Sequence, residues 1–309
     1  MTAVVISMPG NEVLADQLAV ALELDRVAAI VRHFPDGESH VRVDSAVQGR
    51  HALIVCTLDR PDAKLLPLFL LAYALRESGA VSVGLVAPYL PYMRQDRQFH
   101  PGETVSAVHV SGWIARHLDW LVTVDPHLHR ITDLAQVYSI PTRVIHAAPD
   151  VAAWVQANVR QPLLVGPDEE SVQWVREVAR GADAPFVVLT KERRGDRDVM
   201  VSVPEVERWL SHTPVLVDDI VSTARTMIET VGHLRRAGLA APACVAVHAI
   251  FAESAFEDLH AAGAADIVSC DTIVHLSNRI ALATSIGAGV REMLAGARSQ
   301  PETIRRGTP

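Results

Sequence analysis

The sequence predicts an α/β protein with two tandem domains, each a mainly parallel sheet flanked by helices. Short apolar runs of four to seven residues, typical of buried parallel strands, alternate with amphipathic segments of helical length. The same strand–loop–helix–strand pattern occurs twice along the 309 residues. Hydrophobic residues make up 49% of the chain and aromatic residues only 5%, a balance that favours an α/β protein over an all-β one.

The first copy of the pattern begins with an apolar strand at residues 53–56. A polar loop with Asp59 and Asp62 follows, and a helix over residues 65–78 ends at Gly79, which is suited to a C-terminal cap. A second strand is expected over residues 81–87. A further apolar run, residues 119–125, predicts another strand of this sheet.

The second copy has a strand at residues 215–217, a loop over 218–226, a helix that ends at Gly238, and a strand at 244–250. Residues 266–271 then parallel residues 119–125. This recurrence indicates a duplication. We expect one domain over residues 1–146, a second over 147–296, and a polar, disordered tail over 297–309.

Composition and charge exclude several functions. The formal net charge is −8, which argues against a nucleic-acid partner, because such proteins normally present a basic face. Apolar runs do not reach membrane-spanning length, and the N-terminus lacks signal-peptide features, so we expect a cytoplasmic protein without membrane contact. The three cysteines, Cys56, Cys244 and Cys270, are far apart and form no Cys-x-x-Cys pair, which favours buried, reduced thiols.

Residues 214–227 are the most informative segment. An apolar strand leads to Asp218 and Asp219, and a hydroxyl-rich turn precedes a helix. Backbone N–H groups at such a helix start suit a phosphate, the hydroxyl groups can add donors, and the carboxylates can hold ribose hydroxyls or a magnesium-bound water. An acidic strand end with a polar turn fits the segment alone equally well. The segment resembles the phosphoribosyl pyrophosphate-binding loop of type I phosphoribosyltransferases.

Two motifs in the first half fit nucleotide binding. Residues 33–38 form a Pro- and Gly-containing turn that presents Phe34 and two carboxylates, although an ordinary exposed turn explains it as well. Residues 91–97 follow a strand, where α/β sheets bind ligands. Arg94 and Arg97 could contact phosphates and Gln95 an adenine edge; the alternative is a solvated loop.

Three further strand ends carry polar groups. His127 could contact a metal or a nucleotide phosphate, and zinc is disfavoured because no Cys or Glu completes a ligand set nearby. Asp168, with the two glutamates after it, suits magnesium, or alternatively an acidic helix start. The charged run 190–198 fits either a solvated loop or a mobile lid that neutralises phosphate charge.

Together these motifs resemble the ribose-phosphate diphosphokinases, also called phosphoribosyl pyrophosphate synthetases, over residues 4–295. The resemblance rests on Phe34-Pro35-Asp36-Gly37-Glu38, Pro91-Tyr92-Met93-Arg94-Gln95-Asp96-Arg97, Asp125-Pro126-His127, Pro167-Asp168, Lys191-Glu192-Arg193 and Val217-Asp218-Asp219. It implies two tandem type I phosphoribosyltransferase-like domains. It also implies a transferase of nucleotide biosynthesis that moves pyrophosphate from ATP to ribose 5-phosphate, with Mg²⁺ as cofactor and a homo-oligomer built from dimers.

The resemblance also implies roles for individual residues. The catalytic residues would be Lys191 and Arg193. ATP would be bound by Phe34, Asp36, Gly37, Glu38, Arg94, Gln95, Asp96, Arg97 and His127. The metal would be held by His127 and Asp168. Ribose 5-phosphate would be bound by Asp218, Asp219, Ser222, Thr223, Ala224, Arg225 and Thr226.

The chain departs from the family pattern in two loops. Ser222 stands where the family has an acid, and Arg225 where it has a glycine, so the arginine could strain the turn, fill the pocket or contact a phosphate. Residues 169–171 replace a small, glycine-containing stretch. Two other hypotheses therefore stay open: a phosphoribosyltransferase that consumes phosphoribosyl pyrophosphate, and a non-catalytic homologue that binds nucleotide and regulates a true synthetase.

Overall fold

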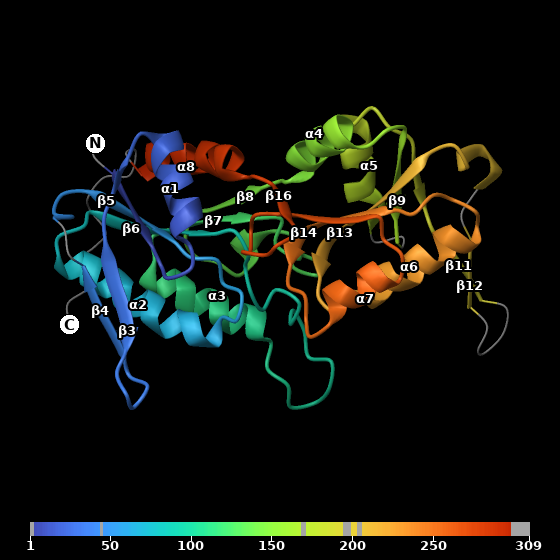
Figure 1. Cartoon of the computed structure of the whole chain (residues 1–309). Helices are drawn as coiled ribbons and strands as arrows, with labels where there is room; N and C mark the ends of the chain where they lie inside the picture. Colours follow the sequence, from blue (N-terminus) through green and yellow to red (C-terminus); the bar gives the residue numbers. More distant parts are fainter. Residues whose placement is uncertain (1–2, 44–45, 168–170, 194–198, 203–205, 298–309) are drawn as a thin grey trace. The chain divides into compact units, whose positions relative to one another are not determined.

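The structure is a computed structural model, and it describes residues 3–43, 46–167, 171–193, 199–202 and 206–297. The chain divides into two compact units. The first comprises Met1–Ile145 together with Ala283–Pro309, and the second comprises His146–Leu282. Each unit has its own α/β architecture (Figure 1).

The first unit is built on a six-stranded parallel sheet in the order β2-β1-β5-β6-β7-β8. The strands of this unit are β1 (Ala3–Ser7), β2 (Asp25–Arg26), β5 (His51–Val55), β6 (Ser82–Ala87), β7 (Trp120–Val124) and β8 (Thr142–Ile145), with a separate antiparallel hairpin of β3 (Ala29–His33) and β4 (Ser39–Val43). Every residue of β5, β6 and β7 is buried. These central strands are therefore covered on both faces, which explains their unbroken apolar runs.

Four helices cover the first sheet. Helices α1 (Glu12–Leu22) and α8 (Ala283–Ala297) lie on one face, and α2 (Asp62–Glu77) and α3 (Ser106–His117) on the other (Figure 1). A short 3₁₀ helix, η1 (Leu134–Gln136), precedes β8. A core of mainly Leu, Ile and Val side chains lies between β1, β5, β6 and β7 and the helices α2 and α3.

The second unit has the same plan. Its parallel sheet has the order β10-β9-β13-β14-β15-β16. The strands of this unit are β9 (Pro162–Gly166), β10 (Phe186–Val188), β13 (Thr213–Val221), β14 (Ala243–Ala249), β15 (Asp266–Cys270) and β16 (Asn278–Ile280), with a hairpin of β11 (Thr190–Arg193) and β12 (Val199–Ser202). The helices are α4 (Ala148–Asn158), α5 (Val172–Gly181), α6 (Arg225–Arg236), α7 (Ala255–Ala261) and the 3₁₀ helix η3 (Val206–Trp209).

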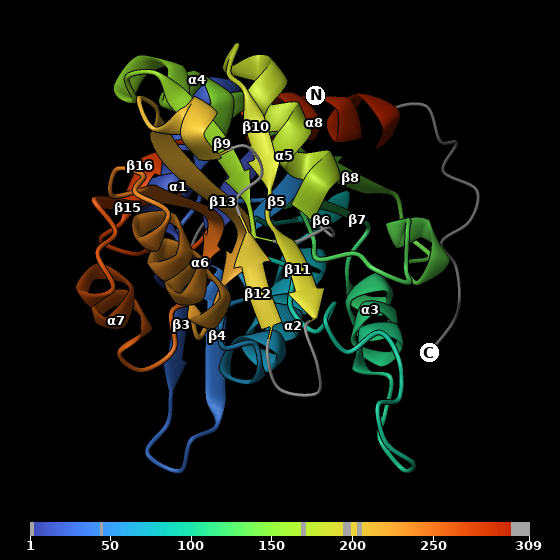
Figure 2. The same ribbon diagram turned by 90° about the vertical axis from the view of Figure 1, so that its right-hand side faces the viewer.

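The two units repeat one topology strand by strand. In each sheet, the strand that comes second in the sequence lies at one edge, next to the first strand, and the third strand lies on the other side of the first. A two-stranded antiparallel hairpin is inserted in the sequence between the second and the third of these strands. Figure 2 shows the hairpin of the second unit, β11 and β12, and the corresponding hairpin of the first unit is formed by β3 and β4. The tandem α/β fold expected from the sequence is thus confirmed, and β5, β6 and β7 correspond to β13, β14 and β15.

The C-terminal part of the chain belongs to a different unit from the one expected from the sequence. Helix α8, expected in the second domain, packs against α1, β7 and β8 of the first unit. The guanidinium of Arg143 pairs with Glu292 at 3.0 Å, and Arg291 donates to the carbonyl of Ala21. Sequence periodicity predicts a helix but not its partner, because an apolar helical face fits any complementary sheet. Ala297 ends this helix, and the rest of the expected tail lies outside the described residues.

The helices of the described part of the chain offer no candidate for crossing a membrane, since none of them is both long and apolar enough.

Candidate functional site

The β3–β4 hairpin presents the first predicted nucleotide motif. Its tip closes with a hydrogen bond from the Phe34 N–H to the carbonyl of Glu38 at 2.8 Å, and Gly37 adopts φ 92°, which glycine accepts without strain. The Asp36 carboxylate accepts from the Glu38 N–H at 3.1 Å. The Phe34 ring is 39% exposed, and the Arg32 guanidinium lies 5.2 Å from its centre. A rigid turn therefore offers an aromatic ring on which a flat ligand can stack.

The loop after β6 holds Arg94 and Gln95 in different environments. The Gln95 side-chain oxygen accepts from the Ser106 hydroxyl at 2.6 Å, and its backbone carbonyl accepts from the Ala107 N–H at 3.2 Å. These contacts tie the loop to the start of α3. Arg94 is exposed and makes no hydrogen bond or ion pair with the described residues. The arginine is therefore available to an anionic ligand.

Asp96 and Arg97 face other groups of the first unit. The Asp96 side chain is only 4% exposed, and both its oxygens contact Arg130, from the segment after β7. Burial alone would raise the pKa of Asp96, but the N–H and guanidinium of Arg130 outweigh it and hold that pKa below its ordinary value. The Arg97 guanidinium lies 4.7 Å from the centre of the Phe99 ring. The loops after β6 and β7 are thus joined at one edge of the sheet.

His127 lies at this same edge, directly after β7. Its ring is 4.3 Å from that of His129, edge to face, and the chain turns sharply here because Asp125 adopts φ 28°. The segment is anchored by a hydrogen bond from the Asp125 N–H to the carbonyl of Ile145 at 3.0 Å. The two predicted motifs at residues 91–97 and 123–129 therefore come together in space, through neighbouring strands and the Asp96–Arg130 pair.

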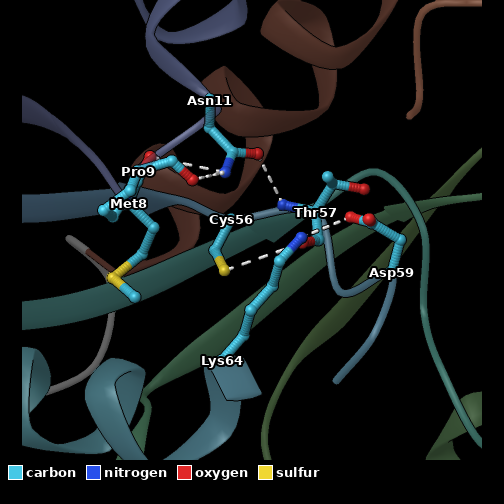
Figure 3. Close-up of polar contacts among 7 residues, drawn as sticks. All are labelled: Met8, Pro9, Asn11, Cys56, Thr57, Asp59 and Lys64. Atoms are coloured by element: carbon cyan, nitrogen blue, oxygen red, sulfur yellow. Dashed lines mark hydrogen bonds and ion pairs between the residues drawn. The ribbon is translucent and has the colours of Figure 1, made fainter. Parts of the chain in front are cut away.

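The loop after β5 occupies the position in the first unit that the predicted sugar-phosphate loop occupies in the second. Side chains of the protein itself hold the polar groups of this loop. The Lys64 ammonium donates to the carbonyl of Thr57 at 3.0 Å and to the Asp59 carboxylate (Figure 3). The buried Asn11 amide accepts from the Thr57 N–H at 2.7 Å and donates to the carbonyl of Pro9 at 3.2 Å. Asp59 and Lys64 neutralise each other, so this loop is a structural support rather than a second anion site.

In the second unit, the two predicted carboxylates lie inside a strand rather than after it. Strand β13 continues to Val221 and pairs with β14 through Asp218 opposite Ala246 and Val221 opposite Ala249. The expected end of the strand at Val217 is therefore wrong. Backbone pairing continues because a partner strand is present, whereas the apolar pattern stops at the first carboxylate. Both carboxylates are half-buried, and the Asp219 N–H donates to Asp218 at 3.0 Å.

In the turn between β13 and α6, the strained backbone conformation lies at a different residue from the one expected to carry it. Ala224, not Arg225, adopts the left-handed conformation, with φ 55°. Arg225 is the first residue of α6, is exposed, and makes no hydrogen bond with the described residues. The expectation that arginine could strain the turn is therefore wrong. Ser222 is half-buried, and Thr223 and Thr226 are exposed beside the free N–H groups of the helix start.

The two predicted catalytic residues lie on one strand. Lys191 and Arg193 both belong to β11, opposite Val201 and Val199 of β12. The charged run was expected to be either a solvated loop or a mobile lid. The solvated loop is wrong for residues 190–193, which form one strand of an antiparallel hairpin. Residues 194–198 and the predicted metal ligand Asp168 lie outside the described residues.

Within the described ranges, no three His, Cys, Asp or Glu residues gather closely enough to hold a metal ion. Magnesium commonly binds through one or two carboxylates, several waters and substrate phosphates, so it does not need such a cage. Asp218 and Asp219 offer the kind of oxygen donors it prefers.

Sequence patterns missed the residues that support these loops. Tyr92 donates its hydroxyl to Asp62, and this carboxylate, with a smaller contribution from burial, raises the pKa of Tyr92 to about 12. Asn11 and Arg130 are equally unexpected. Their partners are 30 to 46 residues away in sequence, so only the fold reveals them. The left-handed Tyr92, at φ 64°, had no sequence signal either, because tyrosine does not favour this conformation.

Comparison with known proteins agrees with this architecture. Residues 3–116 match the N-terminal domain of ribose phosphate pyrophosphokinase, and residues 134–281 match the phosphoribosyl transferase domain. Phosphoribosylpyrophosphate synthetase from Mycobacterium smegmatis has the same fold, with a TM-score of 0.81 at 22% identity over 96% of this chain and all of that one. The fold and the loops at its strand ends thus define a tandem phosphoribosyltransferase-type α/β protein.

Two relatives give the family. Ribose-phosphate pyrophosphokinase from Methanobrevibacter smithii is 30% identical over 300 residues, covering 93% of this chain and all of the relative. The Halobacterium salinarum protein of the same name is 33% identical over 258 residues, covering 82% and 88%. The chain belongs to the ribose-phosphate pyrophosphokinase family. The family, the fold class and the enzyme class expected from the sequence are confirmed.

Proposed function

We propose that the chain transfers the β,γ-pyrophosphoryl group of ATP to the 1-hydroxyl of ribose 5-phosphate, giving 5-phosphoribosyl 1-pyrophosphate and AMP. The observation that carries this proposal is the match to ribose-phosphate pyrophosphokinases over 93% of the chain. Lys191 and Arg193, the pair that resembles the catalytic residues of this family, lie on the β11–β12 hairpin. The hydroxyl oxygen attacks the β-phosphorus, and the bond from this phosphorus to the α,β-bridging oxygen breaks. AMP leaves, and the hydroxyl proton is released.

ATP is assigned to the first unit. Phe34 on its hairpin stacks on the adenine, with Asp36, Gly37 and Glu38 forming the turn around it. Arg94 and His127 contact phosphates, and the side-chain amide of Gln95 remains able to donate, since its oxygen is taken by Ser106. Arg97 contributes positive charge near the same edge. Asp96, with both oxygens on Arg130, acts by fixing the loop.

Ribose 5-phosphate is assigned to the loop between β13 and α6. The backbone N–H groups of residues 223–226 and the hydroxyls of Ser222, Thr223 and Thr226 suit the 5-phosphate. The carboxylates of Asp218 and Asp219 suit the ribose hydroxyls, which donate hydrogen bonds. Ala224 supplies the left-handed turn that brings the chain from strand to helix.

Lys191 and Arg193 are assigned to the transferred group. Pyrophosphoryl transfer needs in-line positioning and positive charge where the oxygens gain negative charge, and it needs little covalent chemistry from the protein. An ammonium and a guanidinium, two residues apart on one strand, provide such charge. This is why the two are proposed as catalytic groups rather than as ground-state binding groups.

Mg²⁺ is proposed as the cofactor, because it neutralises and orients the ATP phosphates when bound. Asp168 is its proposed protein ligand. His127, also expected as a metal ligand, better suits a phosphate, since magnesium is a hard cation that prefers oxygen. A homo-oligomer built from dimers is also proposed, from family membership. Light scattering of the purified chain measures its mass against the 33.5 kDa of one copy.

Product analysis tests the proposed function. Purified protein is incubated with ATP, ribose 5-phosphate and Mg²⁺, and AMP is resolved from ADP. Equal amounts of AMP and 5-phosphoribosyl 1-pyrophosphate are expected. ADP would show simple phosphoryl transfer and would contradict the assignment of Lys191 and Arg193. Binding of ATP without turnover would favour a regulatory homologue, and pyrophosphate release with a base acceptor would favour a phosphoribosyltransferase.

A further inference from the structure

Tyr92 has an unusual backbone conformation two residues before Arg94. Its φ of 64° lies in the left-handed region, which bulky residues rarely adopt unless their surroundings hold them there. Its ring packs against the core of the first unit, and its hydroxyl donates a hydrogen bond to the Asp62 carboxylate. Both the ring and the hydroxyl group of Tyr92 are therefore held in place.

The backbone around Arg94 is fixed on both sides, while its side chain is not. The Gln95 N–H donates to the carbonyl of Tyr92 at 2.9 Å, which closes a tight turn over Arg94. Gln95 is in turn fixed by Ser106 and Ala107 at the start of α3. The Arg94 guanidinium makes no hydrogen bond with the described residues. The orientation of this guanidinium thus depends on the turn that begins at Tyr92.

Asp62, the acceptor for Tyr92, stands on a well-supported loop. It is the first residue of α2, where the helix dipole favours a carboxylate. The preceding loop is fixed by Lys64 and Asn11 through Thr57 (Figure 3), and by the Leu58 N–H, which donates to the carbonyl of Tyr89 at 3.2 Å. The loop after β5 therefore acts as a rigid platform for the loop after β6.

We propose that Tyr92, held by Asp62, is a positioning residue that aims Arg94 at the phosphates of ATP. This inference rests on the proposed function. Without the hydroxyl contact, Tyr92 is free to leave the left-handed conformation, and the turn that carries Arg94 then reorients. Small displacements of a positioned charge have large effects, up to about a hundredfold for a shift of about 1 Å.

The test compares Tyr92→Phe with Tyr73→Phe. Both changes remove one phenolic hydroxyl, and Tyr73 lies exposed on α2, where its ring contacts His117. Tyr92→Phe is expected to raise the KM for ATP about fivefold or more, as for loss of a charge-assisted hydrogen bond, with the KM for ribose 5-phosphate and the Tm unchanged. Tyr73→Phe is expected to change none of these. Asp62→Ala should reproduce Tyr92→Phe, and Asp62→Asn, which keeps an acceptor oxygen, should restore most of the ATP affinity.

A double variant separates positioning from general support. If Tyr92 acts through Arg94, Tyr92→Phe adds nothing to the loss of ATP affinity already caused by Arg94→Ala. Additive losses, equal effects on both substrates, or a Tyr92→Phe enzyme that matches Tyr73→Phe would overturn the inference. An active wild type with such results would leave the proposed function intact. A wild type that binds ATP but makes no 5-phosphoribosyl 1-pyrophosphate would overturn the proposed function alone, since ATP affinity can still be measured for each variant by calorimetry. A wild type that binds no ATP would overturn both.

Discussion

The carboxylate of Asp96 accepts hydrogen bonds from the backbone N–H of Arg130 at 3.1 Å and from its guanidinium, which lies 3.2 Å from one carboxylate oxygen and 3.4 Å from the other. The two residues follow adjacent strands, β6 and β7, so their contact joins two loops that carry Arg94 and His127. Asp96 was expected from the sequence to bind ATP, but both of its carboxylate oxygens contact Arg130 instead. Its expected contribution to ATP binding is indirect.

Asp96→Asn tests this relationship. The amide keeps one acceptor oxygen but loses the charge, and Arg130 is 52% exposed, so we expect a loss of about 1–2 kcal/mol in stability. The midpoint of thermal unfolding at pH 7 should fall by a few degrees. Glu77→Gln, which changes an exposed carboxylate at the end of α2, is the control and should leave the midpoint unchanged.

The pH dependence of the Asp96 contribution follows from its lowered pKa. The folded-state pKa lies below the ordinary value, so the stabilisation is fully present above about pH 3.9 and is lost as pH falls through the folded value. The difference in unfolding midpoint between wild type and Asp96→Asn should therefore be constant from neutral pH down to about pH 5 and shrink below about pH 4. A difference that grows on acidification would show that Asp96 is protonated in the folded protein.

The left-handed Ala224 leads to a stabilising substitution. A non-glycine residue in this region costs about 1–2 kcal/mol, whereas glycine loses about 0.5–1 kcal/mol through the unfolded state. Ala224→Gly should therefore stabilise the second unit by about 0.5–1 kcal/mol. Ala237→Gly, at the right-handed C-cap of the same helix, should have the opposite sign. Equal destabilisation by both would show that Ala224 is not strained in solution.

Arg225 is expected to help bind the sugar phosphate. It is exposed at the first position of α6, beside the N–H groups assigned to the 5-phosphate. Arg225→Ala should raise the KM for ribose 5-phosphate about three- to tenfold at low salt, and added salt should reduce the effect, because exposed charges are screened. Arg236→Ala, at the other end of this helix, should have no effect. A lower KM in Arg225→Ala would mean instead that the arginine fills the pocket.

Strand and helix periodicity predicted the tandem sheets, because buried parallel strands have unbroken apolar runs such as Leu53–Val55 and Val215–Val217. The apolar pattern failed to predict strand residues that are polar but still paired through their backbone. These are Asp218 and Asp219 within β13 and the charged residues of β11. It also could not predict the partner of α8. Such outcomes depend on tertiary contacts between residues far apart in sequence.

The same limit applies to the site. Arg94, Gln95 and Phe34 could be selected by residue type and by position after strands or in turns. The contacts that decide their roles, Ser106 with Gln95 and Arg130 with Asp96, have no sequence signature. Left-handed Ala224 was unpredictable because alanine has no preference for that conformation.

The cysteines are expected to be unreactive in the folded protein. Burial raises the pKa of the Cys56 and Cys244 thiols to about 12, so almost no thiolate, the reactive form, exists at pH 8. All three cysteines are buried, and none of them takes part in a disulfide bond. Titration with a chromogenic disulfide should therefore find no rapidly reacting thiol in the native enzyme and three in urea. Rapid reaction of one thiol without denaturant would indicate local opening of the segment that carries it.

Lys191 is expected to act on the transition state rather than on the bound substrates. If its ammonium meets charge that develops during transfer, Lys191→Ala should lower kcat by about a hundredfold or more and change the KM for ATP little. Glu192→Ala, the residue between Lys191 and Arg193 on β11, is the matched control and should keep kcat within about threefold, as for a residue outside the machinery. Steady-state kinetics with AMP detection measure both variants. A raised KM with intact kcat would mean that Lys191 binds ground-state ATP. Because groups that act as a unit are not additive, Lys191→Ala with Arg193→Ala should cost little more than the worse single change, and fully additive losses would show that the two residues act separately.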